Sequence, residues 1–206
     1  MKILTFQIKK DCVFLSMTKQ LLSQNPLFVF ALEIEAAAAF ENFNNAFVGI
    51  GKVSSTYNLM RRIAVEKPSI VVNLGSAGST EFPRGSVINC TKFIQRDMDV
   101  GPLGYAKFET PFSNENPILG YGISIPNLTQ GICGTGDSFE VAHVNHEYNV
   151  IDMEAFPLAL VCKKEGIPFL CLKYISDGAD GAAAEDWLVS VHHAALVLRA
   201  EIDRLT

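Results

Sequence analysis

The sequence predicts a single-domain α/β protein. Apolar runs of strand length alternate along the chain with segments of helical composition and spacing. Glycine-rich, small-residue segments follow several of these runs, as expected of turns at which a ligand can approach the backbone. The length of 206 residues fits one such domain, and it is long enough to bury a substantial core.

The expected elements follow from these patterns. We expect strands at Leu27–Leu32, Ser69–Leu74, Ser86–Asn89, Gly131–Thr135 and Phe169–Ile175, with Met1–Phe6 as a further candidate and Gly120–Asn127 as an ambiguous edge strand. We expect helices at Ala36–Phe40, Val53–Glu66, Met153–Glu165 and Glu185–Leu205, and a helical turn at Thr18–Leu22. A small-residue turn is expected at Gly75–Ser79.

The C-terminal helix carries an apolar stripe at helical spacing. The stripe consists of Trp187, Val191, Ala194, Ala195, Leu198 and Ile202. Such a stripe is typical of a helix that packs on a core, so we expect all six side chains to be core residues.

Composition argues against several classes of partner. The net charge is −5 and no basic stripe is present, so nucleic acid is not an expected partner. No apolar run is long enough to span a membrane. The five cysteines are an odd number at scattered spacings, which favours free thiols in the cytoplasm. Hydrophobic residues make up 49% of the chain, which leaves apolar surface for a subunit interface.

Acidic residues stand where expected strands end. Glu33 and Glu35 follow the first apolar run, Glu154 lies at a strand-to-helix junction, and Asp177 follows the last strand. Ligands of α/β proteins bind outside the carboxyl ends of strands, so these carboxylates are candidates for catalysis. For the Glu33–Glu35 pair, a favourable charge at a helix N-terminus is an equally good explanation.

Two other motifs give weaker signals. The segment Gly49–Ser54 is a near miss to a phosphate-binding glycine loop, but Val53 stands where a Walker A motif needs Ser or Thr, so a tight turn is preferred. His143 and His146 are spaced as metal ligands on a helix would be, yet no third ligand lies nearby. We therefore expect surface or helix-end histidines and no metal.

Six segments, in order, resemble the nucleoside phosphorylase/nucleosidase superfamily, and most of all its 5'-methylthioadenosine/S-adenosylhomocysteine nucleosidases. They are Ala31–Glu35, Gly49–Val53, Val71–Gly78, Gly136–Phe139, Asp152–Ala155 and Ile175–Asp177. The resemblance implies a central mixed β-sheet flanked by helices in three α/β/α layers. It also implies a purine nucleoside as the small-molecule partner, no cofactor, and a homodimer with Leu103, Tyr105 and Pro111 at the cross-subunit contact.

The resemblance also implies a role for each matching residue. Glu35 would activate water, and Asp177, held by Ser176, would protonate the purine at N7. Glu154 would bind the ribose hydroxyls. The remaining residues would complete the pocket: Met153 under the sugar, Phe139 stacked on the purine, the Glu140 backbone on the base edge, and Ser76 and Gly78 around the sugar and water.

This assignment suits the chemistry of N-glycosidic cleavage. The base leaves more readily when protonated, and carboxylates stabilise the oxocarbenium-like sugar and deprotonate water. Phosphorylases of the superfamily place an arginine just before the Gly-Ser turn, whereas Asn73 and Leu74 stand here, so water is the expected nucleophile. A phosphorylase, a nucleosidase for another purine nucleoside, and an inactive nucleoside-binding homologue remain alternatives.

The chain departs from the family pattern in several places. Residues 1–26 form an N-terminal extension of unclear role ahead of the domain at 27–206. The stretch Ala36–Val48 is short, and Ser113–Gln130 replaces a family helix. Lys173 stands where arginine is common, and Glu140 where an apolar residue is usual.

Overall fold

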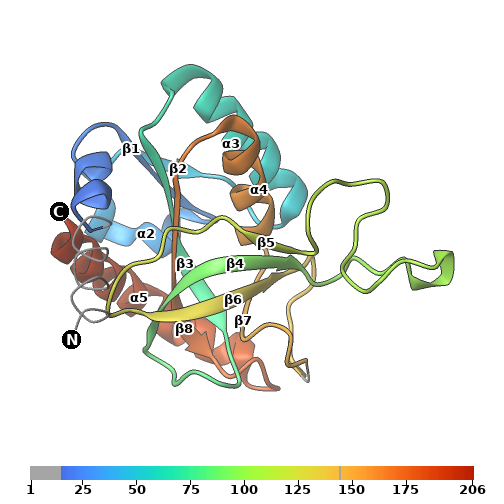
Figure 1. The fold of residues 1–206 in the computed structure, drawn as a ribbon. Helices are drawn as coiled ribbons and strands as arrows, with labels where there is room; N and C mark the ends of the chain where they lie inside the picture. Colours follow the sequence, from blue (N-terminus) through green and yellow to red (C-terminus); the bar gives the residue numbers. More distant parts are fainter. Residues whose placement is uncertain (1–14, 144) are drawn as a thin grey trace, which may run out of the picture.

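The computed structural model describes residues 15–143 and 145–206, in which one mixed β-sheet lies between two layers of helices (Figure 1). The strands are β1 (Pro26–Phe30), β2 (Asn45–Phe47), β3 (Ile70–Gly78), β4 (Val87–Gln95), β5 (Ile118–Gly120), β6 (Thr129–Thr135), β7 (Val150–Asp152) and β8 (Phe169–Asp177). The helices are α2 (Glu33–Ala36), α3 (Lys52–Glu66), α4 (Ala155–Glu165) and α5 (Ala183–Leu205), with 3₁₀ turns at Ala37–Phe40 and Gly101–Leu103. The candidate strand at Met1–Phe6 lies outside the described residues.

The sheet partly closes on itself. Its strand order is β2-β1-β3-β7-β6-β4-β5, and β8 pairs with both β3 and β4. The strands β3, β8, β4, β6 and β7 therefore form a closed ring of pairings. β8 runs parallel to β3 and antiparallel to β4. This closure brings the ends of β3, β7 and β8 together, although these strands are far apart in the sequence.

The two larger hydrophobic cores of the described residues lie on the two faces of the sheet. One core packs α3 and α4 against the sheet, through residues such as Leu59, Leu158 and Phe169. The other packs α2, the first 3₁₀ turn and α5, through residues such as Phe40 and Leu198. The five residues named from these cores are fully buried. The expected three-layer α/β/α arrangement is confirmed (Figure 1).

The glycine-rich segment at Gly75–Ser79 is not a turn, and this expectation was wrong. β3 continues to Gly78 and pairs with β8 as far as Asp177, with a shift in register between Ala77 and Gly78. The small residues remain in the strand because they pack against the neighbouring strand and the site. A Cβ atom at Gly78 would lie 2.7 Å from Asp177 Oδ1, so only glycine fits beside that carboxylate.

Two further expectations need correction. His143 and His146 lie in irregular backbone and not on a helix. The edge strand β5 is displaced toward the N-terminus of its expected range, and beyond it only Gly122 forms an isolated bridge, to Phe169. A Cβ atom at Gly122 would lie 2.4 Å from the Cys90 carbonyl oxygen, so this crossing depends on glycine.

Residues 96–117 connect β4 to β5 as a long segment that projects from the sheet (Figure 1, yellow-green, right). In the described part of the chain, no helix is long and apolar enough to cross a membrane. The four described cysteines, Cys90, Cys133, Cys162 and Cys171, are free and buried.

Candidate active site

A cavity of about 210 Å³ opens where β1, β3, β7 and β8 end. All nine residues predicted for the site line it: Glu35, Ser76, Gly78, Phe139, Glu140, Met153, Glu154, Ser176 and Asp177. The ring of strand pairings accounts for this convergence, because it places the carboxyl ends of β3 and β8 beside the end of β7. The structure also adds lining residues that the sequence analysis did not assign to the site, among them Ile50 and Trp187.

Glu35 is held rigidly at the start of α2, just after β1. Its Oε1 atom accepts hydrogen bonds from the Ser76 backbone N–H at 3.1 Å and from the Ser76 hydroxyl at 2.8 Å. Its Oε2 atom accepts one from the Leu32 N–H at 3.2 Å. The side chain is buried, and the three donors fix its orientation. The carboxylate is thus positioned to accept a proton inside the cavity.

Asp177 lies at the end of β8 with both oxygens in contact with the protein. Its Oδ2 atom accepts a hydrogen bond from the Ser176 hydroxyl at 2.7 Å, and Oδ1 accepts one from the Ala179 N–H at 2.9 Å. The residue is buried at the cavity wall. These contacts fix the orientation of the carboxyl group, in the arrangement expected for Ser176.

Glu154 occupies the junction between β7 and α4. Its Oε1 atom accepts a hydrogen bond from the Gly51 N–H at 2.9 Å, which ties it to the turn before α3. Burial raises the pKa of Glu154 to about 8, the charges of Asp152 and Glu35 add to the rise, and Lys173 opposes it. At neutral pH Glu154 is therefore mainly the neutral acid.

A buried ion pair lies next to Glu154. Lys173 Nζ on β8 is 2.8 Å from Asp152 Oδ2 on β7, and the two side chains are 3% and 1% exposed. The other contacts of Asp152 are the Thr135 hydroxyl at 2.5 Å and the Ala155 N–H at 2.8 Å. Burial alone would raise the pKa of Asp152, but the Lys173 ammonium and these hydrogen bonds outweigh it, and the pKa is lowered.

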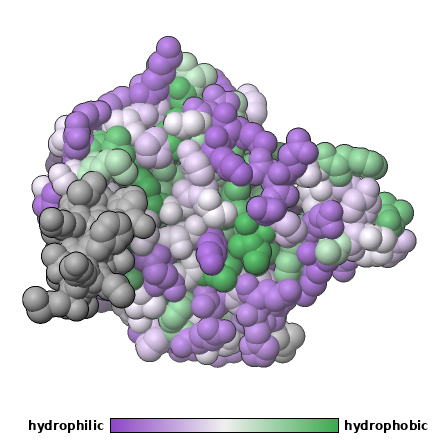
Figure 2. All heavy atoms as spheres, in the orientation of Figure 1, coloured by the Kyte–Doolittle hydropathy of each residue, from purple (hydrophilic) through white to green (hydrophobic). Residues whose placement is uncertain are grey.

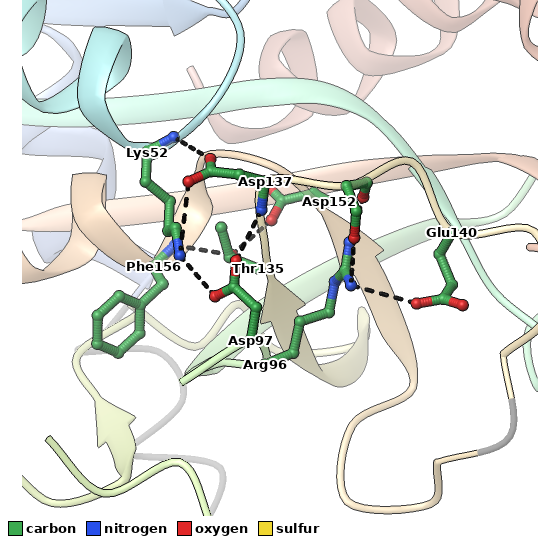
Figure 3. Close-up of polar contacts among 9 residues, drawn as sticks. Lys52, Arg96, Asp97, Thr135, Asp137, Glu140, Asp152 and Phe156 are labelled. Atoms are coloured by element: carbon green, nitrogen blue, oxygen red, sulfur yellow. Dashed lines mark hydrogen bonds and ion pairs between the residues drawn. The ribbon is translucent and has the colours of Figure 1, made fainter. Parts of the chain in front are cut away.

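The segment after β6 forms one wall of the cavity. Phe139 is about half exposed there, with its ring available for a planar ligand. The side chain of Glu140 pairs with Arg96 at 3.2 Å, and Arg96 also donates to the carbonyl and hydroxyl oxygens of Ser138 (Figure 3). The side chain of Glu140 is therefore held by Arg96.

A second polar network joins this wall to the turn before α3. Lys52 Nζ lies 2.5 Å from Asp97 Oδ1 and 3.6 Å from Asp137 Oδ2. The Lys52 backbone N–H also donates to Asp137 at 2.7 Å (Figure 3). The segment Gly49–Ser54, which resembles a phosphate-binding glycine loop, is thus a tight turn. Gly51 has a φ of +85°, and the neighbouring Lys52 is bound to protein carboxylates.

Trp187 is the residue that sequence reasoning misplaced. The rest of the apolar stripe of α5 is buried in the core, as expected. Trp187 instead lines the cavity, where its Nε1–H donates to Ser76 Oγ at 2.7 Å. Its position in the helix gave a usable signal, because the first turns of α5 follow directly on the segment after Asp177.

The lining carries no positive side chain. None of the described residues that line the cavity is a lysine or an arginine. Arg84, the arginine nearest in the chain to the end of β3, pairs with Asp186 at 2.7 Å and with Asp180 at 3.5 Å. Within residues 15–143 and 145–206, no cluster of His, Cys, Asp and Glu could hold a metal ion.

Comparison with known families accounts for this arrangement. The sequence model described as "Phosphorylase superfamily" matches residues 2–204. The chain belongs to the phosphorylase superfamily. This match confirms the resemblance drawn from the six motifs, and it extends over nearly the whole chain.

Individual relatives point to one branch of the family. The chain is 30% identical over 155 residues to the 5'-methylthioadenosine/S-adenosylhomocysteine nucleosidase of Actinobacillus succinogenes, covering 66% of this chain and 67% of that protein. It is also 30% identical over 182 residues to the enzyme of the same name from Haemophilus influenzae, covering 76% and 79%.

Solved structures show the same fold. Futalosine hydrolase of Helicobacter pylori aligns with a TM-score of 0.79 at 20% identity, covering 88% of this chain and 98% of that one.

Proposed function

We propose that this protein is a purine nucleosidase that hydrolyses the N-glycosidic bond of 5'-methylthioadenosine- and S-adenosylhomocysteine-type nucleosides and releases adenine. The observation that carries the proposal is the meeting of Glu35, Glu154 and Asp177 in one cavity that has no cationic lining. The protein is a hydrolase of N-glycosyl compounds, and the similarity to two curated nucleosidases supports this specificity.

Asp177 serves the leaving base. In the proposed reaction it donates a proton to N7 of the purine, which converts the base into a better leaving group. Its hydrogen bonds from Ser176 and Ala179 hold the carboxyl group in one orientation. Phe139 offers a ring face on which the purine can stack, as aromatic side chains do with planar ligands.

Glu154 and Glu35 serve the sugar and the nucleophile. Glu154 hydrogen-bonds the ribose hydroxyls, and Met153 packs beneath the ring. As the C1'–N9 bond breaks, positive charge develops on the ribose, and the nearby Glu35 carboxylate stabilises it. Glu35 takes a proton from water as the water oxygen attacks C1', beside Ser76 and Gly78.

Water is favoured over phosphate by the electrostatics of the cavity. A phosphate dianion needs positively charged side chains, or several strong hydrogen-bond donors, at its binding site. The lining instead gathers acidic residues and no lysine or arginine, and the nearby Lys173 is already paired with Asp152. A phosphate beside Glu35 would lie next to a negative charge without compensation.

The test is to incubate the protein with 5'-methylthioadenosine, S-adenosylhomocysteine or adenosine in phosphate-free buffer. The release of free adenine is measured by chromatography. Futalosine belongs in the panel because a fold neighbour is a futalosine hydrolase. Asp177→Asn should lower base release by about 10²–10⁴-fold. Asp203→Asn, an exposed change on α5, is the matched control.

Three results would contradict the proposal. They are strict dependence on phosphate, activity only on another nucleoside, and tight adenine binding without turnover. The first two correspond to the phosphorylase and other-nucleoside alternatives, and the third to an inactive homologue.

We also propose a homodimer, in which the projecting segment 96–117 reaches the partner subunit. Leu103 is 74% exposed and Phe112 is 97% exposed, and Tyr105 packs edge-on against Phe112. Figure 2 shows hydrophobic side chains gathered on this projection. Exposed aromatic and aliphatic groups of this size are typical of an interface. The cytoplasmic location remains a prediction from the cysteine pattern.

A further inference from the structure

We propose that Trp187 is a positioning residue for water activation: its indole N–H fixes the Ser76 hydroxyl, which in turn orients the Glu35 carboxylate. This inference rests on the proposed function, in which Glu35 deprotonates water. It assigns a role to a side chain that the sequence pattern had placed in the core.

The direction of the hydrogen bonds follows from the donors available. An indole N–H can only donate, so at 2.7 Å Ser76 Oγ must be the acceptor. The Ser76 hydroxyl has one hydrogen, and that hydrogen is then directed at Glu35 Oε1, 2.8 Å away. Trp187, Ser76 and Glu35 thus form a chain of bonds with a single polarity.

This chain makes the two oxygens of Glu35 unequal. Oε1 accepts two hydrogen bonds, both from Ser76, whereas Oε2 accepts one, from the Leu32 N–H. Oε2 therefore keeps more free acceptor capacity, and we assign it as the oxygen that takes the proton from water. Hydrogen bonds linked in series strengthen one another. Loss of the indole donor therefore weakens the hydrogen bond from the Ser76 hydroxyl to Glu35 Oε1.

The position of Trp187 is fixed by α5. The helix begins at Ala183, and its buried stripe from Val191 onward anchors it on the sheet. The ion pair between Asp186 and Arg84, at 2.7 Å, holds its first turn. The indole therefore reaches Ser76 from a rigid element, as a positioning role requires.

The first test is Trp187→Phe, which keeps an aromatic ring but removes the donor. We expect kcat for base release to fall about tenfold, with KM within about twofold of wild type. Val189→Ala, an exposed change on the same helix, should leave both constants unaltered. In a Ser76→Ala background, Trp187→Phe should cause no further loss, because the acceptor is already missing.

A second measurement tests the same role without relying on the folding of the Trp187→Phe variant. Trp187 is the only tryptophan in the chain, so its benzothiophene isostere, with sulfur in place of N–H, can be incorporated globally at this one position. The same tenfold loss is expected. The emission of Trp187 should also shift in the Ser76→Ala protein without any substrate, because the indole loses its acceptor.

The outcomes separate the two proposals. An active wild-type protein with unaltered kcat after either replacement would overturn the role of Trp187 alone. Fully additive losses from Trp187→Phe and Ser76→Ala would overturn it as well. Absence of base release from every nucleoside by the wild-type protein would overturn the proposed function itself.

Discussion

At the scale of single residues, the acidic groups of the site differ in the number of hydrogen bonds that they accept from the protein. Glu35 accepts three protein hydrogen bonds, whereas Glu154 accepts one and lies beside the Asp152 charge. Burial with few donors favours the neutral form of a carboxyl group. Burial, with the Asp152 charge, therefore raises the pKa of Glu154.

Glu154 predicts a pH dependence of stability. Burial, with the Asp152 charge, raises its pKa from an ordinary 4.5 to about 8. The native state therefore binds more protons than the unfolded state between these values, and the free energy of unfolding should fall as pH rises from about 4.5 to 8. Glu154→Gln, which mimics the neutral acid, should remove about 2–5 kcal/mol of that decline.

Urea denaturation at pH 5, 6.5 and 8.5 measures the effect. Exposed Glu81→Gln is the matched control and should retain the wild-type slope. A Glu154→Gln protein that loses stability with pH as steeply as wild type would show that Glu154 is already ionised at low pH.

At the scale of elements, the buried Asp152–Lys173 pair fixes β7 relative to β8. The two strands are not paired directly; each pairs with β3. The ion pair thus spans the ring beneath the cavity, and the Thr135 hydroxyl adds β6 to the same contact.

Lys173→Met should lower the free energy of unfolding by about 3–5 kcal/mol, because it leaves Asp152 buried without its counter-charge. The double variant Lys173→Met with Asp152→Asn should lose less than the sum of the two single losses. Urea denaturation at neutral pH gives all three values. Strictly additive losses would mean that the two side chains do not depend on each other.

At the scale of the whole molecule, closure of the sheet assembles the site and the projecting segment extends away from it. The ring of β3, β8, β4, β6 and β7 brings the carboxylates together. Segment 96–117 carries exposed Leu103 and Phe112, which one subunit alone does not cover.

Sedimentation should show a dimer at micromolar concentration for the wild-type protein. Phe112→Asp should yield a monomer with weakened base release, since a charge in an apolar interface opposes association. Leu196→Asp, at an exposed position of α5, is the control and should remain dimeric. A monomeric wild-type protein would contradict the proposed homodimer.

The sequence by itself determined the fold class, most of the elements and the chemical character of the site. Apolar runs and helical spacing are local properties, so β1, β8, α3 and α4 could be predicted within a few residues. The motifs around Glu35, Glu154 and Asp177 could be recognised because each is contiguous in the chain.

Only the tertiary structure decided how these segments meet. A helical period predicts that Trp187 is on the same face as Val191, but cannot tell core from cavity. Likewise, small residues at Gly75–Gly78 suit a turn or a tightly packed strand equally well, and the pairing with β8 selected the strand. The Asp152–Lys173 pair and the Trp187–Ser76 bond join residues distant in sequence, and no local pattern records such contacts.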